Sequence, residues 1–227
     1  MQEAAKQFQQ AQRVQTSMLA AVEKKVLLWL AARTPRAINS DHLTVLGMVA
    51  MVAAGACYAY ARVNKWALLW VIVCLALNWV GDSLDGTLAR FRNQQRPRYG
   101  FYVDHIVDSV SAVFLLGGLG LSGYMSMWVA VLLLVTYFLL SIEVYLATYA
   151  IGTFRISFFA FGPTELRILL AIGNIALLLR GPMSHLFGHN WLLFDIGGVI
   201  GAAGMVLIFI YAAVTHTRQL YNEERLP

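Results

Sequence analysis

Charged residues are scarce in this sequence. They make up 13% of its 227 residues, against about 25% in an ordinary soluble domain, whereas 59% of its residues are hydrophobic. Several apolar runs are long enough to cross a hydrocarbon core roughly 30 Å thick. We therefore expect an all-α, polytopic membrane protein. The net charge of +5 indicates basic loops beside a membrane rather than a nucleic-acid partner.

Cysteine is also rare, and this limits the possible cross-links and metals. The two cysteines, Cys57 and Cys74, lie inside apolar runs, where a thiol usually acts as a small apolar side chain. No cluster of cysteine and histidine suggests zinc. The first 16 residues are polar and rich in glutamine, so we expect no cleavable signal peptide.

Hydrophobic periodicity divides the chain into a surface helix and a bundle of spans. Residues 17–33 mix apolar and basic positions at helical spacing, which predicts an amphipathic helix on the membrane surface. We expect two regions, a juxtamembrane segment over 1–38 and a six-span domain over 39–227. The six transmembrane helices are predicted at 41–62, 66 into the stretch after residue 80, 102–123, 125–151, 164–181 and 190–215.

The distribution of positive charge predicts the orientation. With six spans and the N-terminus in the cytoplasm, only Arg62, Lys65 and Arg180 of the 17 lysines and arginines lie outside. Cytoplasmic loops carry an excess of such residues. We therefore expect an integral protein of the inner or cell membrane with both termini in the cytoplasm.

Four aspartates interrupt the apolar pattern between the second and third spans. Asp82 and Asp85 are spaced i, i+3, and Asp104 and Asp108 are spaced i, i+4, so each pair shares one face of a helix. If the two spans form a hairpin, the two pairs face each other. Four carboxylates that converge near a membrane need a counter-charge.

A divalent cation, or two, would supply that counter-charge. Carboxylate oxygens suit hard ions such as Mg²⁺, Mn²⁺ and Ca²⁺, and a Mg²⁺ site made of carboxylates leaves positions for phosphate oxygens. This chemistry indicates a phosphate-ester or diphosphate substrate. A simpler alternative is a solvated loop in which the acids pair with arginines of the same stretch, which are Arg90, Arg92, Arg96 and Arg98.

The same stretch resembles the CDP-alcohol phosphotransferase family. The family pattern is D-x-x-D-G-x-x-A-R, a short loop, and G-x-x-x-D-x-x-x-D, and all eight of its fixed positions are present within 27 residues here. They are Asp82, Asp85, Gly86, Ala89, Arg90, Gly100, Asp104 and Asp108. A looser likeness lies upstream, where Asn39, Leu43, Thr44 and Gly47 are similar to the start of the family's first span.

This resemblance implies an activity and a set of roles. Family members transfer a substituted phosphate from a CDP-linked donor to an alcohol and release CMP. By this likeness Asp82, Asp85 and Asp104 would bind Mg²⁺ or Mn²⁺, and Asp108 would contact a second ion and deprotonate the acceptor. The residues that would shape the pocket for the CDP moiety are Gly86, Ala89, Arg90 and Gly100. Members are typically homodimers, which a strip of Gly197, Gly201 and Gly204 could serve, as could packing within one chain.

Two stretches resemble the choline and ethanolamine phosphotransferases of this family. Residues 103–114 contain D-H-x-x-D-S, and residues 152–168 contain a Thr-Glu pair. The likeness implies that His105 acts as a base oriented by Glu165 and that the acceptor is a lipid alcohol. Two other interpretations stay open: His105 as an ordinary interfacial residue, and Glu165 as a residue favoured in the first turn of a helix.

Two further functions compete with this assignment. The chain is shorter than the choline and ethanolamine enzymes, so transfer from CDP-diacylglycerol to a small polar alcohol is an alternative. There Arg155 and Arg167 could bind a phosphorylated acceptor, or could be ordinary juxtamembrane residues. The alternative of another class is a cation transporter, but its acids would lie near the bilayer midplane on broken helices. Among the deeper positions only Glu143 is acidic. It could line a cavity for the lipid acceptor, or it could form a hydrogen bond within the bundle.

Overall fold

The computed structural model describes residues 12–14, 19–155, 162–186 and 188–224, and within them the chain is almost entirely helical. The helices are α1 (Ala20–Arg33), α2 (Ser40–Ala61), α3 (Ala67–Phe91), α4 (Pro97–Leu121), α5 (Met127–Ile151), α6 (Pro163–Arg180) and α7 (Leu193–Glu223). Short strands flank them: β1 (Gln12–Val14), β2 (Thr153–Arg155), β3 (Met183–Leu186) and β4 (His189–Leu192). This confirms the all-α membrane fold.

The helices correspond to the expected elements with shifted boundaries. The predicted surface helix begins three residues later than expected, although residues 17 and 18 lie outside the described residues. The third span begins at Pro97 instead of 102, because proline at the first helical position suits a helix start. The division into regions 1–38 and 39–227 stays a prediction.

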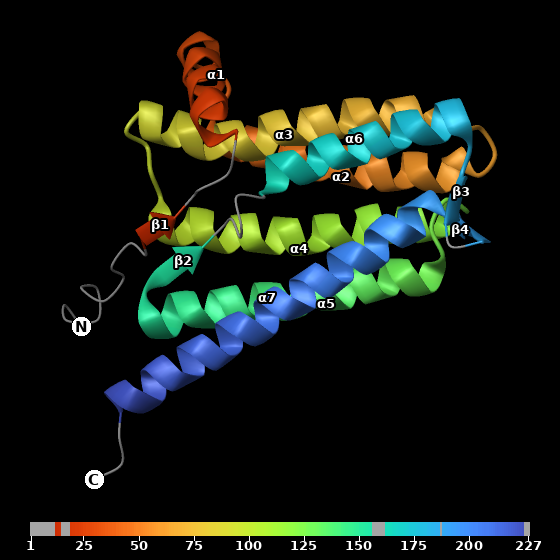
Figure 1. Ribbon diagram of the computed structural model, residues 1–227. Coiled ribbons are helices and arrows are strands. Elements are labelled where there is room, and N and C mark those ends of the chain that lie inside the picture. Colours follow the sequence, from red (N-terminus) through yellow and green to blue (C-terminus); the bar gives the residue numbers. More distant parts are fainter. Residues whose placement is uncertain (1–11, 15–18, 156–161, 187, 225–227) are drawn as a thin grey trace.

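Five of the helices are long and apolar enough to cross a membrane, which makes the chain an integral membrane protein. They are α2, α3, α4, α5 and α7. The other expected span forms α6, which has 18 residues and includes Glu165, Arg167 and Arg180. Figure 1 shows α6 running beside α3 within the bundle. The count of six spans therefore stays a prediction.

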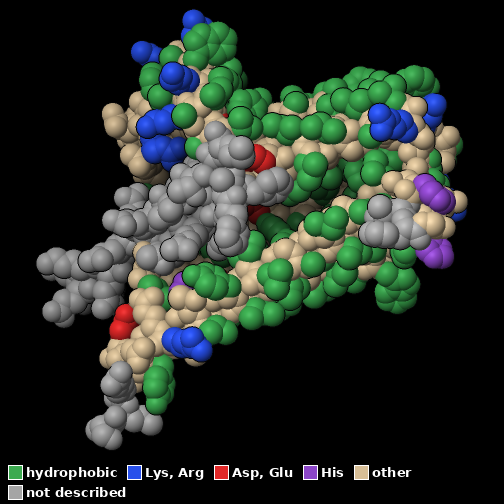
Figure 2. All heavy atoms as spheres, viewed as in Figure 1, with side chains coloured by type: hydrophobic (Ala, Val, Ile, Leu, Met, Phe, Trp, Pro, Cys, Tyr) green, Lys and Arg blue, Asp and Glu red, His purple; other side chains and the backbone are tan. Residues whose placement is uncertain are grey.

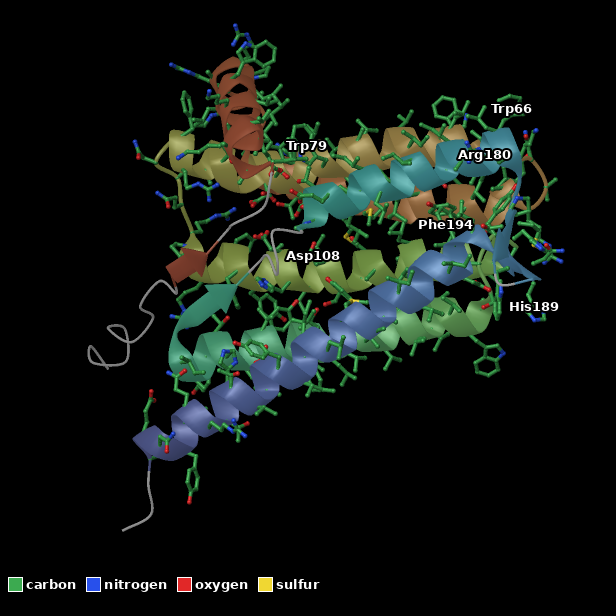
Figure 3. The ribbon with its side chains drawn as sticks, in the orientation of Figure 1. Trp66, Trp79, Asp108, Arg180, His189 and Phe194 are labelled. Carbon is green, nitrogen blue, oxygen red and sulfur yellow. The ribbon has the colours of Figure 1, made fainter. Side chains whose placement is uncertain are left out.

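The helices of the bundle alternate in direction, and α1 crosses them (Figure 1). The α3–α4 connection lies at the same end as α1 and the last turns of α7. Lys24, Lys25 and Arg33 belong to this end, whereas Arg180 lies at the other (Figure 3). These four basic residues therefore lie toward opposite ends of the bundle, and the predicted orientation in the membrane stays a prediction.

Glycines bring α2 into close contact with both α3 and α4. A Cβ added to Gly81 of α3 would lie 2.5 Å from the Gly47 nitrogen, and one added to Gly118 of α4 would lie 2.0 Å from the Gly55 oxygen. Without side chains at these positions the helix backbones can approach each other, as is common in membrane bundles. This three-helix unit positions the acidic residues of α3 and α4 against α2.

A buried core extends from this unit toward the end that carries the β3–β4 hairpin. Tyr58 of α2 is fully buried and packs edge-on against Phe194 of α7, with ring centroids 6.4 Å apart. Asn174 of α6 donates to the Tyr58 hydroxyl at 3.0 Å. In Figure 2 apolar side chains cover most of the visible outer surface of the bundle, as a hydrocarbon environment requires.

The α5–α7 pair carries a buried acid. Glu143 of α5 is 8% exposed, and its Oε1 lies 2.5 Å from Nδ1 of His216 on α7. Of the interpretations of Glu143, hydrogen bonding within the bundle is therefore the one that the contacts favour. In the predicted glycine strip, a Cβ on Gly201 would lie 3.6 Å from Leu133, whereas Gly197 and Gly204 have open space around them.

Candidate active site

The four aspartates of the predicted site line one cavity. Asp82 and Asp85 reach it from α3, and Asp104 and Asp108 reach it from α4. The other residues that line it are Thr44, Gly47, Asn78 and Val107. The helical hairpin predicted from their spacing therefore does bring the two pairs together. Figure 3 labels Asp108, which lies on the side of α4 that faces α3.

Asp82 is paired with a cation from another helix. Its Oδ2 lies 2.5 Å from Nη2 of Arg167 on α6, and Nε of the same arginine donates to Asn78 Oδ1 at 2.8 Å. Asn78 in turn donates to the Gly47 carbonyl oxygen at 3.0 Å. A network thus connects α2, α3 and α6 along one wall of the cavity.

Asp85 is the most enclosed of the hydrogen-bonded acids at this cavity. Asp85 is 7% exposed, and its Oδ2 accepts a hydrogen bond from the Thr44 hydroxyl at 2.6 Å. Thr44 comes from the first turns of α2, whose start is capped by the Asn39 side chain. Thr44, which belongs to the upstream stretch that resembles the family's first span, is therefore a direct partner of Asp85.

The chemistry of this donor set suits a hard divalent cation, but its present geometry is incomplete. Among the described residues, no three side chains of His, Cys, Asp or Glu are grouped closely enough to hold a metal ion. One oxygen of Asp82 is bonded to Arg167 and one of Asp85 to Thr44. These two bonds use part of the acceptor capacity of Asp82 and Asp85, which a bound cation would share or replace.

A second cavity adjoins the first and contains three of the residues expected around the CDP moiety. Gly86, Ala89 and Gly100 line it, and it shares Thr44, Asp85 and Asp104 with the first. A Cβ on Gly100 would meet no described atom within 4 Å, so the absence of a side chain there leaves room rather than relieving a clash.

Arginines of the α3–α4 region have distinct positions around this second cavity. Arg96 lines it, forms an ion pair with Asp41 and stacks on Tyr99, with the guanidinium carbon 4.1 Å from the ring centroid. Arg90 instead folds over Gly86, and its Nη2 donates to Thr87 at 3.2 Å. Arg96 therefore pairs with an acid of α2, and the solvated-loop alternative for the four aspartates stays open.

His105 lies on α4 between two aromatic rings. Its ring centroid is 4.1 Å from that of Phe101 and 4.6 Å from that of Tyr145 on α5. Its Nδ1 lies 2.5 Å from the Phe101 carbonyl oxygen, which leaves Nε2 as the nitrogen to act as an acceptor in the neutral ring. The role of His105 as a base stays a prediction.

Glu165 connects α6 to the beginning of α1. Its Oε2 accepts from the backbone nitrogen of Gly162 at 3.0 Å, and its Oε1 accepts from that of Leu19 at 3.2 Å. The bond from Gly162 is one that an acid in the first turn of a helix normally accepts, whereas the bond from Leu19 joins two helices that are distant in the sequence. Its proposed orientation of His105 stays a prediction. Arg155 lies in β2, and residues 156–161 between it and α6 lie outside the described residues.

Two buried polar residues were not predicted: Asn78, which lines the cavity, and Glu23, which anchors α1 to α3 and α6. Asn78 is a polar residue in an apolar run, one helical turn before Asp82, and that spacing could have identified it. Glu23 of α1 was counted only as part of a surface helix, yet its Oε1 accepts bonds from Trp79, Ser83 and Thr164. Nothing in the sequence links Glu23 to residues of α3 and α6.

The comparison with protein families agrees with the geometry. A family model described as CDP-alcohol phosphatidyltransferase matches residues 38–216, which is most of the chain. No curated protein matches the chain significantly.

Proposed function

The chain belongs to the CDP-alcohol phosphatidyltransferase family, whose members are transferases that act on CDP-alcohols, and from this we propose a more specific activity. The protein transfers a substituted phosphate from a CDP-activated donor to an alcohol in phospholipid synthesis and releases CMP. The observation that carries this proposal is the single cavity lined by Asp82, Asp85, Asp104 and Asp108. The family membership also argues against the cation transporter.

The four aspartates divide the work. Asp82, Asp85 and Asp104 would hold Mg²⁺ or Mn²⁺, with Asp108 at a second ion. When bound, such ions neutralise the diphosphate and stabilise the leaving CMP oxygen. Asp108 takes the proton from the acceptor hydroxyl, and His105 is the alternative base. Gly86, Ala89, Arg90 and Gly100 bind the CDP moiety; three of them line the adjoining cavity.

The preferred donor is CDP-ethanolamine or CDP-choline, with a lipid alcohol such as diacylglycerol as acceptor. This choice is based on the D-H-x-x-D-S stretch around His105. The position of His105 between Phe101 and Tyr145 supports it, because aromatic rings fix the imidazole beside the aspartates of α4. Glu165 completes this assignment as the residue that orients the base.

One observation favours the alternative, transfer from CDP-diacylglycerol to a small polar alcohol such as serine, glycerol phosphate or an inositol compound. Arg167 forms an ion pair with Asp82, which lines the cavity, and its guanidinium suits a phosphorylated acceptor. A neutral lipid alcohol has no need for that charge.

The remaining proposals concern surroundings rather than chemistry. We place the site, both termini and the α3–α4 connection on the cytoplasmic side of the inner or cell membrane, because most basic residues lie at that end. The protein works as a homodimer in this proposal, with the glycines of α7 as one candidate contact.

A CMP-release assay tests the proposal. Purified protein with Mg²⁺ or Mn²⁺ is given each of CDP-choline, CDP-ethanolamine and CDP-diacylglycerol, crossed with lipid and polar acceptors. We expect release with at least one donor, loss of release in EDTA, and recovery when the ion is restored.

The variant Asp108→Asn gives the residue-level test. It removes the carboxylate that accepts the proton while keeping the shape of the side chain, so release should fall by about 10²-fold or more, the usual contribution of a positioned base. Unchanged turnover in a folded variant would refute the role of Asp108. Activity with CDP-diacylglycerol alone would select the alternative donor.

A further inference from the structure

Arg167 has an unusual set of contacts for a residue in a membrane bundle. Its side chain is 14% exposed, Nη2 is bonded to Asp82, and Nε is bonded to Asn78. Its third nitrogen, Nη1, is buried and has no hydrogen-bond partner among the described residues. A buried guanidinium normally uses all of its donors, so this one is held in place with binding capacity left over.

The Asp82 contact also competes with metal binding. Asp82 offers its Oδ2 to Arg167, and the described acids do not form a complete set of metal ligands in this arrangement. A divalent cation on the same carboxylate would repel the guanidinium strongly, because both are positive and the cavity is partly shielded from water. Arg167 and a metal ion therefore cannot share Asp82 without cost.

We propose that Arg167 is an exchangeable counter-cation: it neutralises Asp82 until a divalent cation takes that carboxylate, and its released guanidinium then binds a phosphate group in the same cavity. This inference deepens the proposed function and rests on it. The phosphate is that of the nucleotide, so Arg167 has this role with either kind of acceptor.

The network around Arg167 suits such an exchange. Asn78 holds Nε at 2.8 Å and is itself 6% exposed and bonded to the Gly47 carbonyl oxygen. This bond keeps the guanidinium at the cavity wall after Asp82 is lost. Nη1 and Nη2 then present two parallel donors, the arrangement that matches phosphate oxygens.

The competing explanation is a fixed ion pair that only positions Asp82. The two explanations predict opposite changes in the affinity for the metal ion when Arg167 is replaced. If Arg167 competes with the metal, removing its charge tightens metal binding and weakens nucleotide binding. If Arg167 only positions Asp82, removing it weakens both, because the ligand loses its orientation.

Mn²⁺ binding to the purified full-length protein in detergent, followed by the EPR signal of free Mn²⁺, decides between them. We expect Arg167→Gln to bind Mn²⁺ at least about five-fold more tightly than wild type, the lower range of coupling between linked sites. CMP affinity at saturating Mn²⁺ should fall by a similar factor. Arg180→Gln is the matched control, since Arg180 ends the same helix far from the cavity (Figure 3) and should change neither affinity.

Equal or weaker Mn²⁺ binding by a folded Arg167→Gln variant overturns the proposal, as does unchanged CMP affinity. If the glutamine variant does not fold, Arg167→Lys serves instead. Its compact ammonium group lacks the planar fork with which Arg167 contacts Asn78 and Asp82, so we expect a smaller tightening for Mn²⁺, and no tightening overturns the proposal. Wild-type Mn²⁺ binding that persists in Asp85→Asn would instead refute the proposed metal site, which separates the two failures.

Discussion

At the scale of single residues, the hydrogen bond from Thr44 to Asp85 is the contact whose contribution to activity is simplest to measure. The Thr44 hydroxyl donates to Asp85 Oδ2 at 2.6 Å and fixes that carboxylate against α2. Thr44→Val keeps the shape of the side chain and removes the donor. Because groups that orient a metal-binding carboxylate typically contribute 10- to 100-fold, we expect CMP release to fall by about that factor.

Thr136→Val is the control for this change. Thr136 is a buried threonine whose hydroxyl donates to the carbonyl oxygen of Leu132 in its own helix. Its replacement should leave the rate of CMP release within about two-fold of wild type, as expected when no ligand is affected. A rate for Thr44→Val as high as that of Thr136→Val would contradict the positioning role.

The residues also show which parts of the site a single sequence reveals. The spacing within each aspartate pair is local, so helix geometry predicted that Asp82 and Asp85, and Asp104 and Asp108, would meet. The partner of Asp82 lies 85 positions away on α6, and no local pattern encodes that distance. Arg167 was therefore predicted as a candidate for a phosphate or as an ordinary juxtamembrane residue, without its aspartate.

At the scale of helices, the contact between α2 and α3 depends on Gly81. A Cβ at this position would lie 2.5 Å from the Gly47 nitrogen and 2.6 Å from the Leu43 oxygen, which are backbone atoms that cannot rotate away. We expect Gly81→Ala to lower the free energy of unfolding by about 1–3 kcal/mol, the usual cost of overpacking. A lower thermal midpoint in detergent would measure it.

Gly117→Ala is the matched change on α4. A Cβ there meets no described atom within 4 Å, so the thermal midpoint should stay the same or rise slightly, because alanine favours helix more than glycine does. If both alanine variants had equal midpoints, the close approach of α2 and α3 would not be a requirement of the fold.

The position of α1 depends on Glu23, which the structure buries against α3 and α6. One oxygen of Glu23 accepts from Trp79 Nε1 at 2.9 Å and from Thr164 Oγ1 at 2.8 Å, and Trp79 lies where α1 meets α3 (Figure 3). Hydrogen bonds to charged groups contribute about 1.5–3 kcal/mol each, so Glu23→Leu should release α1. Faster hydrogen–deuterium exchange over residues 20–33 is the expected result.

Lys24→Leu controls for the change in charge and helix propensity, since Lys24 is exposed beside Glu23. Exchange over residues 20–33 should then stay near the wild-type rate. The sequence predicted the helix itself but not its anchor, because an acid in a basic amphipathic segment is normally assigned to solvent. Only the approach of Trp79 and Thr164 shows that Glu23 faces the protein.

At the scale of the whole molecule, the arrangement of the helices predicts the accessibility of each end. Val63 is 81% exposed in the α2–α3 connection, and Gln95 is exposed in the α3–α4 connection at the other end of the bundle. Single cysteines at these two positions, with Cys57 and Cys74 replaced by alanine, should react with an impermeant maleimide from opposite sides of sealed vesicles. The excess of basic residues assigns Gln95 to the cytoplasmic side.

Labelling of both positions from one side would be incompatible with a spanning bundle, and reversed labelling would place the cavity outside the cell.

The fold as a whole was the most predictable property, because runs of apolar residues directly specify helices in lipid. The number of spans was harder to predict, because α6 is short and carries Glu165, Arg167 and Arg180, of which Arg167 is paired with Asp82.

The polar residues of α6 affect how this helix enters the membrane during synthesis. Arg167 and Asn174 of α6 find their partners on α3 and α2, which leave the ribosome first. An arginine opposes transfer of an isolated helix from the translocon into lipid by about 2.5–3.5 kcal/mol at the helix centre. We expect α6 to remain at the insertion channel until the preceding hairpin has settled beside it, so its integration is a cooperative, late step of synthesis.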